Sequence, residues 1–164
     1  MSVADANKVL IRQFYESFDR HDGNAMAAAY APNARFADPV FGQLTGEQAA
    51  AMWRMFTSRP DSDLRIELRE HQADATSGTA RWVARYTFPS TGKHVVNDIR
   101  ARFRFVDGKV IDHVDDFPFW TWSRQAFGIL GVLIGWTPVL KAAVRRKGRS
   151  DLAKFMGGSS TRKW

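Results

Sequence analysis

The fold is decided by the stretch Val95-Val-Asn-Asp-Ile-Arg-Ala-Arg-Phe-Arg-Phe105. Its apolar residues alternate with charged ones, the two-residue period of a strand that has one face buried and the other in water. A turn at Val106-Asp-Gly108 follows, and then the segment Lys109-Val-Ile-Asp-His-Val-Asp-Asp-Phe117. The two segments are therefore predicted to form an antiparallel hairpin.

Upstream of this hairpin the same alternation occurs over residues 64–68 and 80–88, separated from it by the turn sequence Pro89-Ser-Thr-Gly92. Before residue 60 the period is helical. An amphipathic helix is predicted over residues 5–18, and a short second one carries Met26 and Tyr30 and ends near Pro32. After an extended segment at 35–38, Thr45 and Gln48 form a capping box that begins a third helix. Helices followed by an antiparallel meander predict the α+β class.

From Trp120 onward the pattern is helical again. We predict two short helices, the second beginning at Thr137-Pro138 because proline favours the first helical position. The stretch 157–164 is predicted to be flexible. The expected organisation is a cone domain over residues 1–118, a helical extension over 119–158 that packs on it, and a flexible tail over 159–164.

The composition of the 164-residue chain is that of one globular domain, and the lack of cysteine excludes disulfides and thiolate chemistry. No signal peptide and no apolar run of about 20 residues is present, so a cytoplasmic location is expected. The net charge of +7 lies entirely in residues 141–164, which carry eight basic residues and one acidic residue. Because the preceding 140 residues are neutral, a nucleic-acid partner is not expected.

Candidate chemistry lies on the last strand. Ile111, His113, Asp115 and Phe117 share one face by parity, and the two apolar members indicate that this face is buried. A buried imidazole beside a buried carboxylate can form an acid/base pair. It can equally be a satisfied polar cluster with no reaction to perform. A metal site is not expected, because two ligands are too few without a third.

Asp38 is the third candidate. It shares a strand face with Phe36, and the apolar residues Val40 and Phe41 follow it. Such surroundings raise the pKa of a carboxyl group and make it a useful base. The expected lining of the pocket around these three groups is aromatic and polar: Tyr15, Trp53, Trp82, Tyr86, Asn97, Phe103 and Phe117.

The order of these elements, with Ala34-Arg-Phe-Ala-Asp-Pro-Val-Phe-Gly42 and the final strand carrying His113 and Asp115, resembles the nuclear transport factor 2 like superfamily. The SnoaL-like branch, related to ketosteroid isomerase, is the most similar. The resemblance covers about residues 5–118. It implies a cone-shaped, curved antiparallel sheet wrapped around three N-terminal helices. It also implies a pocket at the wide end and a homodimer formed through the arginine-rich outer sheet face.

For the site, the resemblance implies that Asp38 matches the general base of ketosteroid isomerases, an Asp that precedes proline. The position of their oxyanion tyrosine falls on Phe14, with Tyr15 displaced by one onto a different helix face. The position of their neutral carboxylic acid falls on Ala101, which cannot donate a proton. Steroid isomerisation is therefore not implied. SnoaL-like cyclases carry an acid/base carboxylate on a late strand, the region of His113 and Asp115.

Three functional hypotheses remain open at this point. The first is a cofactor-independent isomerase, cyclase or hydrolase that acts on a small hydrophobic carbonyl or epoxide compound. Asp38 or Asp115 would be its base and His113 the orienting group or proton shuttle. The second is a protein that binds such a molecule in the same pocket without converting it. The third is a peripheral membrane or scaffold protein that acts through the basic helix around 141–149.

Overall fold

The computed structural model of the protein describes residues 1–160 and has the predicted α+β architecture. Its helices are α1 (Val3–Asp19), α2 (Gly23–Ala28), α3 (Gly46–Thr57), α4 (Phe119–Phe127), α5 (Ile129–Ile134) and α6 (Pro138–Ser160). Its strands are β1 (Tyr30–Asp38), β2 (Gly42–Thr45), β3 (Arg65–Ala73), β4 (Ser77–Thr87), β5 (His94–Val106) and β6 (Lys109–Asp116).

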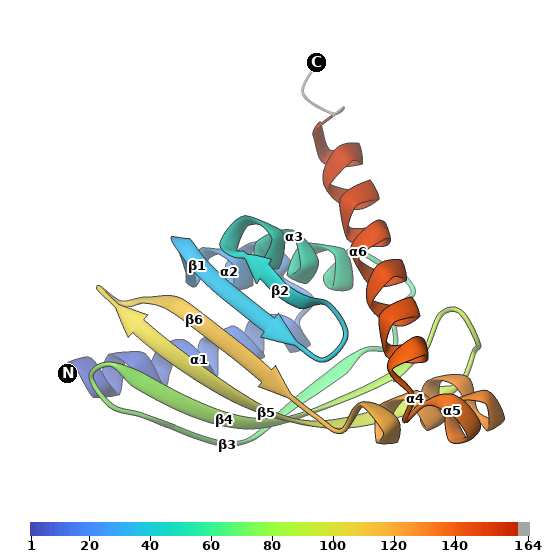
Figure 1. Ribbon diagram of the computed structural model, residues 1–164. Coiled ribbons are helices and arrows are strands. Elements are labelled where there is room, and N and C mark those ends of the chain that lie inside the picture. Colours follow the sequence, from blue (N-terminus) through green and yellow to red (C-terminus); the bar gives the residue numbers. More distant parts are fainter. Residues whose placement is uncertain (161–164) are drawn as a thin grey trace.

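The six strands form one sheet in the order β2-β1-β6-β5-β4-β3. All neighbours are antiparallel except β1 and β6, which run parallel. The sheet is strongly curved, and α1, α2 and α3 lie against its concave side (Figure 1). Register shifts in three of the strand pairs contribute to this curvature, because a bulge bends its strand and increases the twist.

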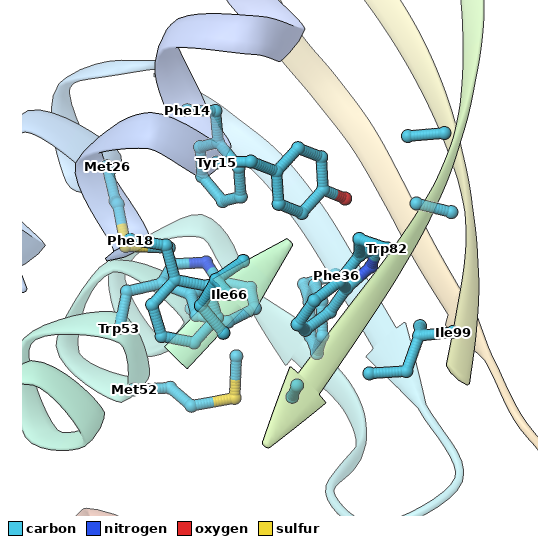
Figure 2. Packing of buried hydrophobic residues seen from close by; sticks show 14 of the residues in the cluster. Phe14, Tyr15, Phe18, Met26, Phe36, Met52, Trp53, Ile66, Trp82 and Ile99 are labelled. Atoms are coloured by element: carbon cyan, nitrogen blue, oxygen red, sulfur yellow. The ribbon is translucent and has the colours of Figure 1, made fainter. Parts of the chain in front are cut away.

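The core fills the space between the helices and the concave face. Phe14, Tyr15 and Phe18 project from α1 toward Trp53 of α3 and Trp82 of β4 (Figure 2). Along β5 every second residue is buried, as its alternation predicts. The curved sheet therefore encloses an aromatic interior.

The local signals at the helix starts are confirmed. Thr45 accepts a hydrogen bond from the Gln48 backbone N–H, and the Gln48 side chain accepts one from the Thr45 N–H. Pro138 is the first residue of α6. These signals succeed because the capping interactions lie within a single helical turn.

The prediction that Tyr30 belongs to a second helix ending near Pro32 is wrong. The helix ends at Ala28, and Tyr30 opens β1, where it pairs with Val110 of β6. The register between β1 and β6 shifts between Tyr30 and Arg35, which indicates a bulge. Pro32 lies within this bulge, where its missing backbone N–H breaks no ladder hydrogen bond. Strand β2 was not predicted, because its four residues are too few to show a period.

The C-terminal extension differs from its prediction in two respects. It contains three helices, since Gly128 with a positive φ of 62° separates α4 from α5. The expected flexible end from Gly157 is helical as far as Ser160, and residues 161–164 lie outside the described part of the chain. Within residues 1–160, no helix is long and apolar enough to cross a membrane.

Candidate functional site

His113 of β6 lies at the centre of the cone and has no exposed surface. Its ring is 4.2 Å from that of Phe103 between centroids, and it stacks on Trp53 and Tyr30 at 6.0 and 6.1 Å. The prediction that this imidazole faces inward is confirmed. Because aromatic rings enclose this imidazole completely, it cannot touch a ligand directly. It can influence a ligand only through the groups to which it is hydrogen-bonded.

The parity argument that led to this prediction was wrong in one step. Ile111 is half-buried and Val110 is the buried residue, the reverse of what a regular strand would give. The cause is a bulge, because Arg104 pairs with Asp112 while the next residue, Phe105, pairs with Val110. Ile111 is the extra residue in β6, so the alternation restarts and brings His113 and Asp115 to the inner face.

A chain of hydrogen bonds holds the imidazole. The Trp53 indole N–H donates to the Tyr30 hydroxyl (2.8 Å), which lies 2.7 Å from His113 Nδ1. His113 Nε2 is 3.0 Å from Asp115 Oδ1. One neutral tautomer, protonated at Nε2, satisfies every donor in this chain, with Tyr30 donating to Nδ1. His113 therefore orients the Asp115 carboxylate.

Asp115 is 4 % exposed, and its Oδ1 also accepts a long hydrogen bond of 3.4 Å from the Trp82 indole. Its direct partner across the sheet is Ala101 of β5. Directly paired residues have their Cβ atoms about 5 Å apart on the same face. The carboxyl group of Asp115 thus lies beside the alanine that the resemblance placed at the neutral-acid position.

Asp38 ends β1 at the wide end of the cone and is half-buried. Its Oδ1 accepts hydrogen bonds from the backbone N–H groups of Val40 (2.9 Å) and Phe41 (2.5 Å). Burial, and to a smaller extent the charge of Asp115, raise the pKa of Asp38 from 3.8 to about 7, against the opposing effect of the Phe41 and Val40 N–H groups and the Arg145 guanidinium. The direction of this shift agrees with the one expected from the apolar residues that follow Asp38.

The Tyr15 hydroxyl is buried and, among the described residues, makes no hydrogen bond. Burial, and then the charge of Asp115, raise the pKa of Tyr15 well above its ordinary value, so the phenol keeps its proton. The hydroxyl points from α1 into the interior (Figure 2). Phe14 and Tyr15 are both buried, at most 3 % exposed, although they are successive residues of α1.

Tyr86 connects this region to the C-terminal extension. It is half-buried near the end of β4, and its hydroxyl accepts a hydrogen bond of 2.8 Å from the Trp122 indole of α4. Burial raises the pKa of Tyr86, and the charge of Asp38 adds to the rise. Asn97 and Phe117, two other residues of the expected lining, are also buried, Asn97 on the inner face of β5. Tyr30 and Trp122 carry no sequence signal of these roles, because each acts through a contact with a residue far along the chain.

The expected aromatic lining is closely packed. Tyr15, Trp53, Trp82 and Phe103 are each at most 4 % exposed, and Tyr15 lies 5.2 Å from Trp82 between ring centroids. Two open hollows of about 320 and 400 Å³ lie on the surface, and neither is lined by Asp38, His113 or Asp115. Neither hollow therefore gives a ligand a route to Asp38 at the wide end of the cone.

Helix α6 lies beside this end. The Arg149 guanidinium donates to the carbonyl oxygens of Phe41 (2.9 Å) and Gln43 (3.1 Å), and Arg145 donates to that of Pro39 (3.4 Å). Both arginines thereby hold the turn that follows Asp38. Within residues 1–160 no group of three or more acidic or histidine side chains is arranged to hold a metal ion.

These features define a class of protein: a curved sheet around three helices, with carboxyl groups gathered inside the cone. In a comparison with known protein families, residues 11–113 match the SnoaL-like domain, and the chain belongs to this family. The fold is that of the nuclear transport factor 2 like proteins. No curated protein matches the chain.

Solved structures show the same fold. A candidate polyketide cyclase from Xanthomonas campestris pv. campestris is 23% identical, covering 76% of this chain and 99% of its own, with a TM-score of 0.64. An LEH-like epoxide hydrolase from M. tuberculosis is 13% identical, covering 80% and 97%, with a TM-score of 0.64. A protein of ketosteroid isomerase-like fold from Catenulispora acidiphila, in complex with trimethylamine, is 14% identical, covering 79% and 97%, with a TM-score of 0.63.

Proposed function

We propose that the protein is a cofactor-independent acid/base enzyme that acts on a small hydrophobic carbonyl or epoxide compound, with Asp38 as its base. The observation that carries this proposal is the state of the Asp38 carboxyl group. One oxygen is held by two backbone N–H groups, and burial places the pKa at about 7. A base with a pKa near the working pH combines a useful ionised fraction with strong proton affinity.

The other groups have supporting roles. On a carbonyl substrate, Asp38 removes a proton from the carbon next to the carbonyl, and the electron pair moves to the oxygen. The buried phenol of Tyr15, which has no partner among the described residues, donates a hydrogen bond to that oxygen. Asp115, fixed by His113 and Trp82, is the second carboxyl group, and its charge helps to keep the pKa of Asp38 high. His113 is a positioning residue, because it is fully enclosed.

Several family relationships support this assignment. The structural neighbours include a candidate polyketide cyclase and an LEH-like epoxide hydrolase, so proteins of this fold are named for different reactions on small molecules. Asp115 lies opposite Ala101, so a carboxyl group is present near the place of the isomerases' neutral acid although it comes from another strand. A cyclase or hydrolase reaction fits this altered arrangement better than steroid isomerisation does.

The test is the exchange of the α-hydrogens of cyclohex-2-enone in D2O, followed by NMR, together with turnover of styrene oxide. Wild-type rates should rise with pH through about 7, because Asp38 must be ionised. Asp38→Asn should lower the rate by about 10²–10⁴-fold. Asp107→Asn is the matched control. Asp107 is exposed and lies in the turn between β5 and β6, at the other end of these strands from Asp38. Equal rates for Asp38→Asn and wild type would contradict the proposal.

A second candidate is binding without conversion in the same interior. It is favoured by the neighbour of ketosteroid isomerase-like fold that holds trimethylamine. This candidate predicts saturable binding of a hydrophobic ligand that Asp38→Asn leaves intact, with no turnover by the wild type.

A homodimer that forms through the outer sheet face is a separate proposal. Arg81 and Asp98 form a bidentate ion pair on that face, and light scattering would test for the dimer.

A further inference from the structure

The C-terminal extension exposes large apolar side chains in one short stretch. Ile129 is 79% exposed, Leu133 64%, Trp136 73% and Val139 76%. Leu130 and Val132, between them, are also at least half exposed. Single exposed apolar residues are ordinary, but a run of this kind within eleven residues marks a contact surface.

The packing of α5 against α4 explains why these side chains point outward. Gly131 and Gly135 form the side of α5 that touches α4, and a Cβ at Gly131 would lie 2.1 Å from the Ser123 carbonyl oxygen. Because the glycines occupy the buried side, the large residues of α5 are left on the other. Figure 1 shows α4 and α5 together at the edge of the molecule, beyond the end of the sheet.

Cations surround this apolar surface. The Arg124 guanidinium lies over the Trp120 ring at 4.9 Å, and Lys141 Nζ lies 5.9 Å from the centre of the Phe119 ring. The Lys93 side chain runs past Gly128, the residue that opens α5. In the part of the chain that the structure describes, none of these three cations has a carboxylate partner. Residues 117–150 contain no Asp or Glu at all.

Three of the basic residues farther along α6 have partners within the chain. Arg145 and Arg149 are engaged with the carbonyl oxygens of the turn after Asp38. Lys147 is paired with Asp151 at 2.6 Å. Unpaired positive charge therefore gathers around α4, α5 and the start of α6, while among the described basic residues of 142–149 Arg146 alone has no such partner.

We propose that the surface formed by α4, α5 and the start of α6 docks on an anionic lipid bilayer. Ile129, Leu133 and Trp136 enter the boundary between headgroups and acyl chains, and Lys93, Arg124 and Lys141 contact lipid phosphates. Apolar side chains rimmed by Lys and Arg are what such an interface binds, and tryptophan favours the headgroup level. The contact is a shallow one, since α5 has only six residues. This proposal is independent of the reaction assigned to Asp38.

Charge favours a bilayer over a second copy of the chain. In a two-fold dimer the same patch meets itself, so the three unpaired cations would be brought close to their symmetry mates. Like charges brought together across an interface oppose association. An anionic surface instead neutralises all three.

The test is flotation of the full chain with phosphatidylcholine vesicles, with and without 30% phosphatidylserine. We expect about tenfold stronger binding to the anionic vesicles, decreasing as salt is raised. Ile129→Asn with Leu133→Asn should weaken that binding at least about tenfold. Val3→Asn with Val106→Asn is the matched control, because both valines are at least half exposed elsewhere. Lys93→Gln with Lys141→Gln should also weaken it, by about tenfold or more.

Two outcomes would overturn the proposal. One is the absence of wild-type binding to anionic vesicles, and the other is equal loss in the Val3/Val106 control. Light scattering on the same variants tests whether a second copy of the chain, and not a bilayer, covers this surface. If Ile129→Asn with Leu133→Asn converts a dimer to a monomer while vesicles are not bound, the patch is an interface between two copies and the membrane proposal is wrong.

Discussion

The cone and the C-terminal extension use apolar residues in opposite ways. In the cone, large rings such as Phe36 and Trp53 are at most 2 % exposed, and the charged residues of β5 face outward. In α5 the glycines face inward and the large aliphatic residues face outward. The buried rings of the cone stabilise the fold, whereas the exposed aliphatic side chains of α5 contribute little to it. Residues of the same chemical type therefore have different roles in the two regions.

The largest expected effect is in the cone. Phe36→Ala should lower the free energy of unfolding by about 3–5 kcal/mol, because it removes a buried ring and leaves a cavity. The cavity opens beside His113, whose ring is 5.1 Å from that of Phe36 between centroids. Urea unfolding followed by circular dichroism measures the change. A loss below about 1 kcal/mol would mean that the interior can collapse, and that the packing described here is not tight.

An intermediate effect is expected where the two regions meet, at Asp38. The pKa of about 7 in the folded protein is above the ordinary 3.8, so the folded state holds this proton more tightly than the unfolded chain does. Stability from Asp38 is therefore present below about pH 4 and is lost as the pH rises through about 7.

Asp38→Asn removes this dependence and keeps an oxygen for the two backbone N–H groups. We expect it to raise the free energy of unfolding at pH 8.5 by about 1–2 kcal/mol, less than the full shift implies because the side chain is only half-buried. At pH 4 the difference between variant and wild type should nearly vanish. Unfolding curves at both pH values check this. A less stable variant at pH 8.5 would show that the Asp38 carboxylate is stabilising, contrary to its raised pKa.

The smallest effect is expected in α5. Ile129→Ala should change the free energy of unfolding by less than about 0.5 kcal/mol, because 79% of the side chain is already exposed. The same unfolding measurement applies, with Ile66→Ala in β3 as the matched buried isoleucine. If Ile129→Ala proved as destabilising as Ile66→Ala, the outward surface of α5 would be covered in solution, and the comparison of the two regions would fail.

Much of the cone could be predicted because its signals are local. Strand alternation, the Thr45 capping box and the turn at Asp107-Gly108 each operate within a few residues. The inward direction of His113 was predicted correctly, but from a regular strand that does not exist. The bulge at Ile111 depends on pairing with β5, and no property of β6 alone reveals it. The same holds for Tyr30, whose strand position is fixed by β6 and whose hydroxyl lies between Trp53 and His113.

The sequence by itself determined the α+β class, the candidate carboxyl groups and the concentration of positive charge after residue 140. Each follows from periodicity or composition, which are properties of neighbours along the chain. The tertiary structure decided which of these groups meet: Asp38 close enough to Asp115 to raise its pKa, and α6 arginines on the turn beside it. It also decided that α5 faces outward, because the close approach of Gly131 to Ser123 joins two helices that composition describes only as apolar.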